Sequence, residues 1–427
     1  MNGSIANKII CDLWDSNRNF CSSDYDKCLE YINKIIPLKI YHYTENANYH
    51  GWVIPPKWNL IKGQITCDNK VIFQASHPLH VIGLSKSFTG KISREELKKH
   101  LHYDSRHSDA IPYHFRQNYR PWDRDWGFCV TKQLYDTLDA DSYNIELLTQ
   151  ESTGYLNVGE HTHQGENPET FVFVAHLDHA GMANDDLAGV AVGVEVFKHL
   201  LSRKTKFTYR LVLVQEIIGS VYYLGKNPET SKHVLESCFL EMLGSNTPLG
   251  LQHTYKGESL LEMELSTILK KKKDAREGPF RSIICNDEMV WESYSIPMAS
   301  LSRFPYPEYH SDFDNPNIIK KEALKESIEI ILELIEKLDK STLMRKKFQG
   351  VLALSNPDYG LYIDPGQMAF GINVPDELKS LRLLMDLLPI LPREIFVEQI
   401  AEKVNLSSDK VLGYLRRWHE KDLIDLI

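Results

Sequence analysis

The chain has 427 residues, of which 42% are hydrophobic and 25% are charged, and its formal net charge is -9. This is the composition of a soluble globular protein, and the length predicts two or three domains. The acidic balance provides no field that would attract nucleic acid or an anionic membrane, and no apolar run approaches the length of a membrane span. Seven cysteines without a CxxC pair and an N-terminus without a signal peptide predict a cytoplasmic protein with reduced thiols.

The first part of the chain predicts one helix and then a β-rich module. Residues 24–36 repeat apolar side chains at helical spacing, which predicts a helix. Two alternating runs flank Asp68-Asn69 and predict a hairpin, and residues 80–88 form a further β-like piece. A short charged helix is expected at about 94–101, before a loop rich in His, Pro, Arg and Trp at 103–127.

The middle of the chain predicts strands that alternate with helices. Helices are expected at 130–138, 187–201 and 321–338, the last of them long and amphipathic. Strands are expected at 143–149, 154–160, 171–175, 209–214, 237–243, 280–285 and 297–301. This alternation predicts an α/β fold whose sheet is mixed, mainly parallel, and covered by helices on both faces.

The C-terminal part predicts a separate module of three short helical patterns followed by Leu423-Ile424, an order typical of a winged helix. Residues 376–427 contain eight Lys plus Arg against ten Asp plus Glu, which disfavours DNA as a partner. Docking on the main domain, or formation of a homo-oligomer, is the preferred use. The predicted domains are therefore 1–45 with 128–345, an inserted β-rich domain at 46–127, and a linker with a winged helix at 346–427.

Polar side chains gather where the predicted strands end. The continuous apolar strand 171–175 leads into His176, Asp178 and Asp185, and the helix that follows carries one apolar stripe. Such residues converge at the carboxyl ends of parallel strands, although a helix cap formed by Asn184, Asp185 or Asp186 is the simpler alternative. The full set of strand-end residues is His176, Asp178, Asp185, Glu216, Glu241 and His310.

Two histidines with several carboxylates suit zinc, as one ion or as a close pair. Such a site activates a water and polarises a carbonyl, which is the chemistry of amide hydrolysis. His179 is expected beside the metal rather than on it, because neighbouring strand residues point to opposite sides.

Five motifs resemble those of the di-zinc aminopeptidases, the family that includes bacterial leucyl aminopeptidases and glutamate carboxypeptidase. They are HLD followed by MANDDLAGVA, then VLVQEIIGS, FLEMLG and IPMASLSRFPYPEYHSDFDNP, and they occur in the family order across residues 130–340. The inserted module and the C-terminal helices are similar to those of a bacterial subfamily of aminopeptidase-like proteins.

The resemblance implies a role for each matching residue. His176 and Glu241 would bind one metal, Asp185 would bridge two metals, and His310 would bind the second. Asp178 would orient His176.

The family's adjacent pair of glutamates is Gln215-Glu216 here. If Glu216 matches the ligand, the base is lost, because Gln215 cannot accept a proton from water. If Glu216 matches the base, the second metal loses a carboxylate. We favour Glu216 as the base in a site with one firmly bound metal.

The leading hypothesis is a zinc-dependent aminopeptidase-like hydrolase that cleaves a peptide or amide bond with metal-activated water. Arg303 and Tyr306 precede His310 and are candidates to bind a substrate carboxylate, with a structural ion pair as the equal alternative for Arg303. A non-catalytic, metal-stabilised binding scaffold is the second hypothesis. A regulator that places its winged helix on DNA is the third.

Overall fold

We describe the protein from a computed structural model, in which residues 4–364, 366 and 374–427 are described. The chain forms two compact units, Met1–Gly257 with Leu265–Glu333, and Glu258–Glu264 with Leu334–Ile427. Within the described residues, no helix is both long enough and apolar enough to cross a membrane. Part of the predicted linker before the C-terminal helices, at 365 and 367–373, lies outside the described residues.

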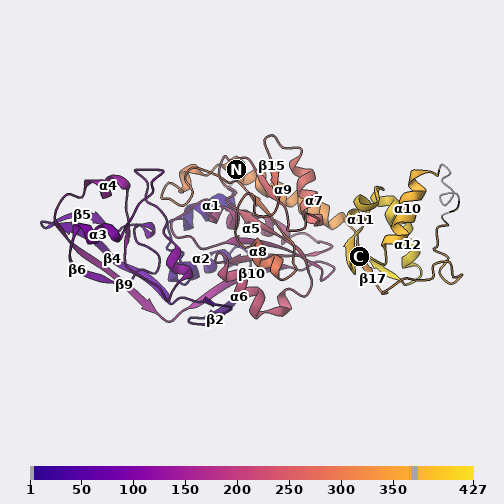
Figure 1. Cartoon of the computed structure of the whole chain (residues 1–427), viewed down its shortest axis with the longest axis horizontal. Coiled ribbons are helices and arrows are strands. Elements are labelled where there is room, and N and C mark those ends of the chain that lie inside the picture. Colours follow the sequence, from indigo (N-terminus) through magenta and orange to yellow (C-terminus); the bar gives the residue numbers. More distant parts are fainter. Residues whose placement is uncertain (1–3, 365, 367–373) are drawn as a thin grey trace. The chain divides into compact units, whose positions relative to one another are not determined.

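The first unit, whose ribbon runs from indigo to orange in Figure 1, is built on an eight-stranded sheet in the order β1-β10-β12-β11-β13-β16-β14-β15. Its strands are β1 (Lys39–Thr44), β10 (Tyr155–His163), β11 (Thr170–His176), β12 (Thr208–Val214), β13 (Val234–Glu241), β14 (Gly250–Gln252), β15 (Arg276–Gly278) and β16 (Met298–Ser302). The central strands β12, β11, β13 and β16 are parallel, whereas β1 and β10 add antiparallel pairs at one edge. The predicted mixed sheet is therefore confirmed.

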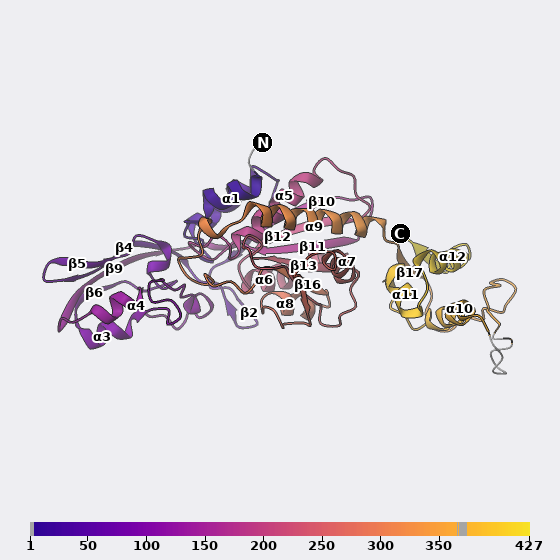
Figure 2. The ribbon, with the colours of Figure 1, turned by 90° about the horizontal axis from the view of Figure 1, so that it is seen from above.

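Helices cover both faces of this sheet. The helices that lie wholly or partly in the unit are α1 (Ile5–Leu13), α2 (Ser23–Asn33), α5 (Leu187–Leu200), α6 (Ile218–Lys226), α7 (Leu260–Leu269), α8 (Glu288–Ser293) and α9 (Lys321–Lys340). Figure 2 shows α1, α5 and the first part of α9 on one face, with α6 and α8 on the other. The strand residues Val172, Val174, Val212 and Val214 alternate along β11 and β12 and pack in one core cluster with Trp291 of α8.

A second sheet belongs to the inserted module. Its strands are β4 (Lys57–Cys67), β5 (Lys70–Gln74), β6 (Phe88–Ser93) and β9 (Ser142–Ser152), in the order β5-β4-β9-β6. The hairpin predicted at Asp68-Asn69 is present, and both residues have positive φ, as a tight two-residue turn requires. Because β9 pairs with β4 and β6, this sheet continues beyond the boundary predicted at residue 127.

Shorter elements complete the first unit. They are α3 (Arg94–Lys99), α4 (Lys132–Thr137), β2 (Asn48–Tyr49), β3 (Trp52–Val53), β7 (Leu101–His102), β8 (Phe128–Cys129), and the 3-10 turns Pro78–His80, Arg116–Tyr119, Pro228–Thr230 and Pro316–Ile318.

Two predicted strands are absent from these described regions. The strand predicted at 80–88 is wrong, because Leu84 has a φ of 58° and so interrupts an extended backbone. Only the last residue of this segment, Phe88, belongs to β6. The piece at 280–285 is also wrong, because the N–H groups of Ile283 and Ile284 donate to the Gln252 Oε1 atom instead of to a neighbouring strand.

The second unit has its own core. The strands β17 (Leu343–Lys346), β18 (Glu394–Phe396) and β19 (Ile424–Leu426) form an antiparallel sheet in the order β18-β17-β19. The helices α10 (Asp376–Leu387), α11 (Val397–Val404) and α12 (Ser408–His419) pack around the fully buried Trp418. The three predicted helical patterns are present, and their interpretation as a winged helix stays a prediction.

Candidate metal centre

The loop between β11 and α5 carries most of the candidate site, and Asp186 fixes its end. Asp186 is the N-cap of α5, where its Oδ1 accepts the Gly189 N–H at 3.1 Å. The same carboxylate accepts the backbone N–H groups of His176, at 3.1 Å, and of Met242, at 2.7 Å. Asp186 is therefore a helix cap, as the simpler alternative from the sequence proposed. Asp185 is not needed as the cap and faces the site.

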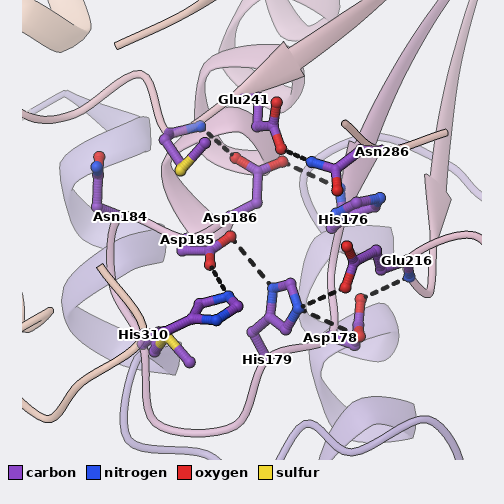
Figure 3. Close-up of polar contacts among 12 residues, drawn as sticks. His176, Asp178, His179, Asn184, Asp185, Asp186, Glu216, Glu241, Asn286 and His310 are labelled. Atoms are coloured by element: carbon purple, nitrogen blue, oxygen red, sulfur yellow. Dashed lines mark hydrogen bonds and ion pairs between the residues drawn. The ribbon is translucent and has the colours of Figure 1, made fainter. Parts of the chain in front are cut away.

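Three side chains converge at the centre of this region, namely His179, Asp185 and His310 (Figure 3). The His179 Nδ1 atom lies 3.2 Å from Asp185 Oδ1, and the His310 Nε2 atom lies 3.0 Å from Asp185 Oδ2. Within the described part of the chain, His179 Nδ1, Asp185 Oδ2 and His310 Nε2 have no hydrogen-bond partner of suitable geometry. In a tetrahedral zinc site, neighbouring ligand atoms are about 3.3 Å apart. We call this set the central triad, and its two imidazoles and one carboxylate fit zinc.

His179 faces the centre because the chain is no longer a strand at this point. The strand β11 ends at His176, and His179 has a φ of 70°, so the alternation of strand side chains does not apply to it. Arg18, which is fully buried, holds the loop in this shape. Its guanidinium donates to the carbonyls of Leu177 at 3.0 Å, His179 at 2.8 Å and Met182 at 2.7 Å.

His176, the metal ligand that the resemblance implied, is paired through Nε2, while its Nδ1 atom has no hydrogen-bond partner among the described residues, so its role as a ligand stays a prediction. Its Nε2 atom lies 2.8 Å from Asp287 Oδ2, and both side chains are fully buried. Asp287 Oδ2 also accepts the Ile217 N–H at 2.7 Å. Burial alone would lower the pKa of His176, but the Asp287 carboxylate outweighs it and raises this pKa to about 9.

A second group of possible ligands, His176, Asp178 and His179, shares His179 with the central triad. A neutral imidazole has a single lone pair, so His179 can serve only one of the two groups. The Asp178 Oδ2 atom is 4.0 Å from His179 Nε2, wider than the separations within the central triad. The geometry therefore favours the central triad.

Asp178 and Glu241 contact partners other than those expected from the sequence. Asp178 Oδ1 accepts the Glu216 N–H at 3.0 Å, so it fixes the end of β12, while Asp287 takes the expected place beside His176. Glu241 accepts a hydrogen bond from the Asn286 side chain. Burial, together with nearby carboxylates, raises the pKa of Glu241 well above its usual range.

Glu216 lies at the site, whereas Gln215 does not. Glu216 Oε2 accepts the Tyr119 O–H at 2.6 Å and lies 3.2 Å from His179 Nε2. Burial would raise the pKa of Glu216, but the contacts with His179 and Tyr119 lower it to about 2. Gln215 is fully buried and donates to the carbonyls of Phe20 and Asn157, so its role is structural.

The inserted module contributes directly to this site, which the sequence did not reveal. The Tyr113 N–H donates to the His310 carbonyl at 2.9 Å, which holds the loop of this ligand candidate. The Tyr113 ring lies edge-on to both His179 and His310, at 5.3 Å and 5.4 Å between centroids. The aromatic residues of the loop at 103–127 were the available signal, because they were too numerous for an ordinary solvated loop.

Arg303 and Tyr306, the candidates for substrate binding, make structural contacts. Arg303 donates to the Thr247 carbonyl at 2.8 Å and pairs with Glu326 at 2.6 Å. This is the ion-pair alternative, with Glu326 as the partner. The Tyr306 O–H donates to Asp314 Oδ2 at 2.6 Å, so its hydroxyl is already used in a structural contact. Substrate binding by either residue stays a prediction.

Asp314 supports the loop that presents Asp185. Its carboxylate accepts the N–H groups of Ala183, Asn184 and Asp185, at 3.2, 2.6 and 3.0 Å, besides the Tyr306 hydroxyl. We expect Asp314→Ala to lower the free energy of unfolding by roughly 3–5 kcal/mol, because several buried donors lose their acceptor. Tyr306→Phe, the matched control, should cost only about 1 kcal/mol. Urea unfolding measures both, and equal losses in the two variants would contradict this role.

The fold and the arrangement of the site define an α/β protein with a candidate metal centre beyond the carboxyl ends of its parallel strands. The chain belongs to the family described as "Domain of unknown function (DUF4910)", which residues 7–341 match. A Clostridium acetobutylicum protein named "Putative polysaccharide biosynthesis protein with aminopeptidase-like domain" is 28% identical over 346 residues, which are 78% of this chain and 77% of that protein.

Solved structures share the fold. A crystal structure of a "putative peptidase" from Clostridium acetobutylicum superposes with a TM-score of 0.75 at 22% identity, covering 99% of this chain and 96% of the other. A zinc aminopeptidase from Bacillus subtilis superposes with a TM-score of 0.58 at 14% identity, covering 78% of this chain and 94% of the other.

Proposed function

We propose that this protein is a zinc-dependent, aminopeptidase-like hydrolase of peptide or amide bonds. The observation that carries the proposal is the central triad, in which one possible ligand atom from each of three residues lies within 4.8 Å of the other two, beside the Glu216 carboxylate. The likeness of fold to a protein named as a zinc aminopeptidase supports it. We further propose one zinc ion per chain, held by His179, Asp185 and His310.

The sharing of His179 between the two groups of possible ligands supports a single ion. His176 and Glu241, which would complete a second site in the di-zinc family, are paired with Asp287 and Asn286. These contacts leave His176 Nδ1 and Glu241 Oε2 without a hydrogen-bond partner among the described residues, so it is the sharing of His179, and not these contacts, that disfavours a second ion.

Each residue of the site has a separate task in this proposal. Zinc bound to the central triad would act as a Lewis acid toward a carbonyl and would lower the pKa of a water. Glu216 is the general base, and Tyr119 and His179 hold its Oε2 atom. The Glu216 contact with His179 Nε2 also keeps the Nδ1 atom of that ring available as a ligand atom.

The remaining predictions concern the rest of the chain. We propose a cytoplasmic location, and a winged helix in the second unit that serves docking or homo-oligomer formation. Charge balance supports a role other than binding DNA, because residues 376–427 carry more acidic than basic side chains.

Hydrolysis of a panel of aminoacyl amides by the zinc-loaded protein tests the proposal. We expect Glu216→Gln to lower kcat roughly 100- to 10,000-fold at saturating zinc, because the proton acceptor is lost. Glu229→Gln, on the exposed surface, is the matched control and should leave kcat unchanged. If the zinc-loaded protein cleaves no member of the panel, the proposed hydrolase activity is wrong. The second hypothesis, a binding scaffold, would then be favoured.

A further inference from the structure

A cavity of about 430 Å³ opens beside Glu216. It is formed by His50, Gly51, Trp52, Phe115, Tyr119, Trp122, Glu216 and Ile217. Most of this lining is aromatic and comes from the inserted module, whereas Glu216 and Ile217 follow β12 of the central sheet. We call this cavity the aromatic pocket.

The walls of the aromatic pocket are fixed to the central domain. The Tyr222 hydroxyl of α6 contacts the carbonyls of Ala47 at 2.7 Å and Trp52 at 2.8 Å, which anchors the hairpin of β2 and β3. The Tyr119 hydroxyl donates to Glu216 on the opposite wall. A pocket held in this way from two sides is largely formed before a ligand arrives.

The aromatic rings that line the pocket pack edge-to-face against one another. Tyr119 lies edge-to-face with Trp52, at 6.2 Å between centroids and 75° between planes, and with Phe115, at 6.1 Å and 87°. Phe115 also packs edge-on against His310 at 5.2 Å. One ring therefore borders both the aromatic pocket and the central triad, so a group in the pocket would lie next to the proposed reaction site.

The few polar and charged groups that line the pocket limit the kinds of ligand that it can bind. Glu216 is its only carboxylate and His50 is its only other ionisable group besides Tyr119, whose hydroxyl is already donated to Glu216. A sugar ring would bury several hydroxyl groups with too few partners here. A negatively charged group would be repelled by Glu216. Trp122 is 64% exposed, so its ring is accessible to a ligand.

We propose that the aromatic pocket binds an aromatic ring with a neutral or positively charged substituent. Flat rings stack on Trp122 and Trp52, and a cationic substituent is attracted both by the ring faces and by Glu216. The role of the pocket in choosing the side chain next to the scissile bond rests on the proposed function, whereas ring binding does not.

Ligand-observed NMR titration of the full chain tests the proposal with benzylamine, benzyl alcohol, benzoate and N-acetylglucosamine. Each titration is made on zinc-loaded and on chelator-treated protein, so that coordination of an amine to zinc is separated from ring binding. We expect benzylamine to bind roughly tenfold more tightly than benzoate in both samples, because Glu216 attracts one and repels the other. A protein that binds the ring but no metal would contradict the proposed function. It would not contradict ring binding by the aromatic pocket.

Substitutions of exposed aromatic residues test whether the ligand binds in the aromatic pocket. We expect Trp122→Ala to weaken benzylamine binding roughly five- to tenfold and Trp122→Phe to retain most of it, because a ring face remains. Tyr255→Ala removes another exposed aromatic ring, 70% exposed and outside this pocket, and should change nothing. Equal binding of benzylamine and benzoate, tighter binding of N-acetylglucosamine than of benzylamine, or an unchanged Trp122→Ala would each overturn the proposal.

Discussion

Replacing His179 by alanine should abolish stoichiometric zinc binding. The change removes one of three converging ligand atoms, and a site left with Asp185 and His310 is incomplete for zinc. Loss of a supporting contact alone typically costs 10- to 100-fold in metal affinity, so loss of a ligand should cost more than ~100-fold. Titration of the apoprotein with zinc against a chromophoric chelator measures the change.

His176→Ala is the matched control for this experiment. We expect it to retain zinc, because the His176 ring is paired with Asp287 outside the central triad. It should lose roughly 3–5 kcal/mol of unfolding free energy, since Asp287 is left buried without its partner. The opposite result, with zinc lost in His176→Ala and kept in His179→Ala, would restore the ligand set implied by the aminopeptidase motifs.

Arg18→Ala should cause the largest loss of stability in the first unit. The Arg18 side chain donates to the carbonyls of Leu13, Trp14, Leu177, His179 and Met182. Each buried carbonyl that loses its donor costs about 1–3 kcal/mol, and the removed side chain leaves a cavity as well. We therefore expect a loss of more than ~5 kcal/mol, measured by urea unfolding followed by far-UV circular dichroism.

Arg18→Lys separates the charge of Arg18 from its geometry. An ammonium group keeps the positive charge but offers three donors in a compact cluster, and it cannot reach all of these carbonyls at once. We expect intermediate stability, with zinc affinity reduced about tenfold because the His179 loop is held less firmly. Unfolding of Arg18→Ala within 1 kcal/mol of the natural chain would show that this loop needs no such support.

The helices and strands were predictable from the sequence where a single hydrophobic pattern dominated a segment. The continuous apolar run at 171–175 and the helical stripe at 187–201 became β11 and α5, since both are buried and need little help from distant residues. The failure at 280–285 has a specific cause. That segment is apolar enough for a strand, but the Gln252 side chain, remote in sequence, takes up its N–H groups.

The site was predictable where residue type alone was informative. Asp185 and His310 were identified from strand ends and motifs, and the structure brings them together. His179 was assigned away from the metal because its direction depends on a loop conformation that Arg18 holds from 161 residues away. The Asp287 partner of His176 is similarly distant, 111 residues further along the chain. Such long-range contacts leave no local pattern from which they could be predicted.

The number and surroundings of zinc ions bound to the natural chain test the central claim most directly. Metal analysis of the purified, zinc-loaded protein, combined with X-ray absorption spectroscopy at the zinc edge, gives both. We expect one zinc ion per chain with two imidazole nitrogens and carboxylate oxygen among its neighbours, as His179, His310 and Asp185 would supply. Two ions per chain would contradict the single-ion proposal, and protein that binds no zinc under any loading condition would contradict the account as a whole.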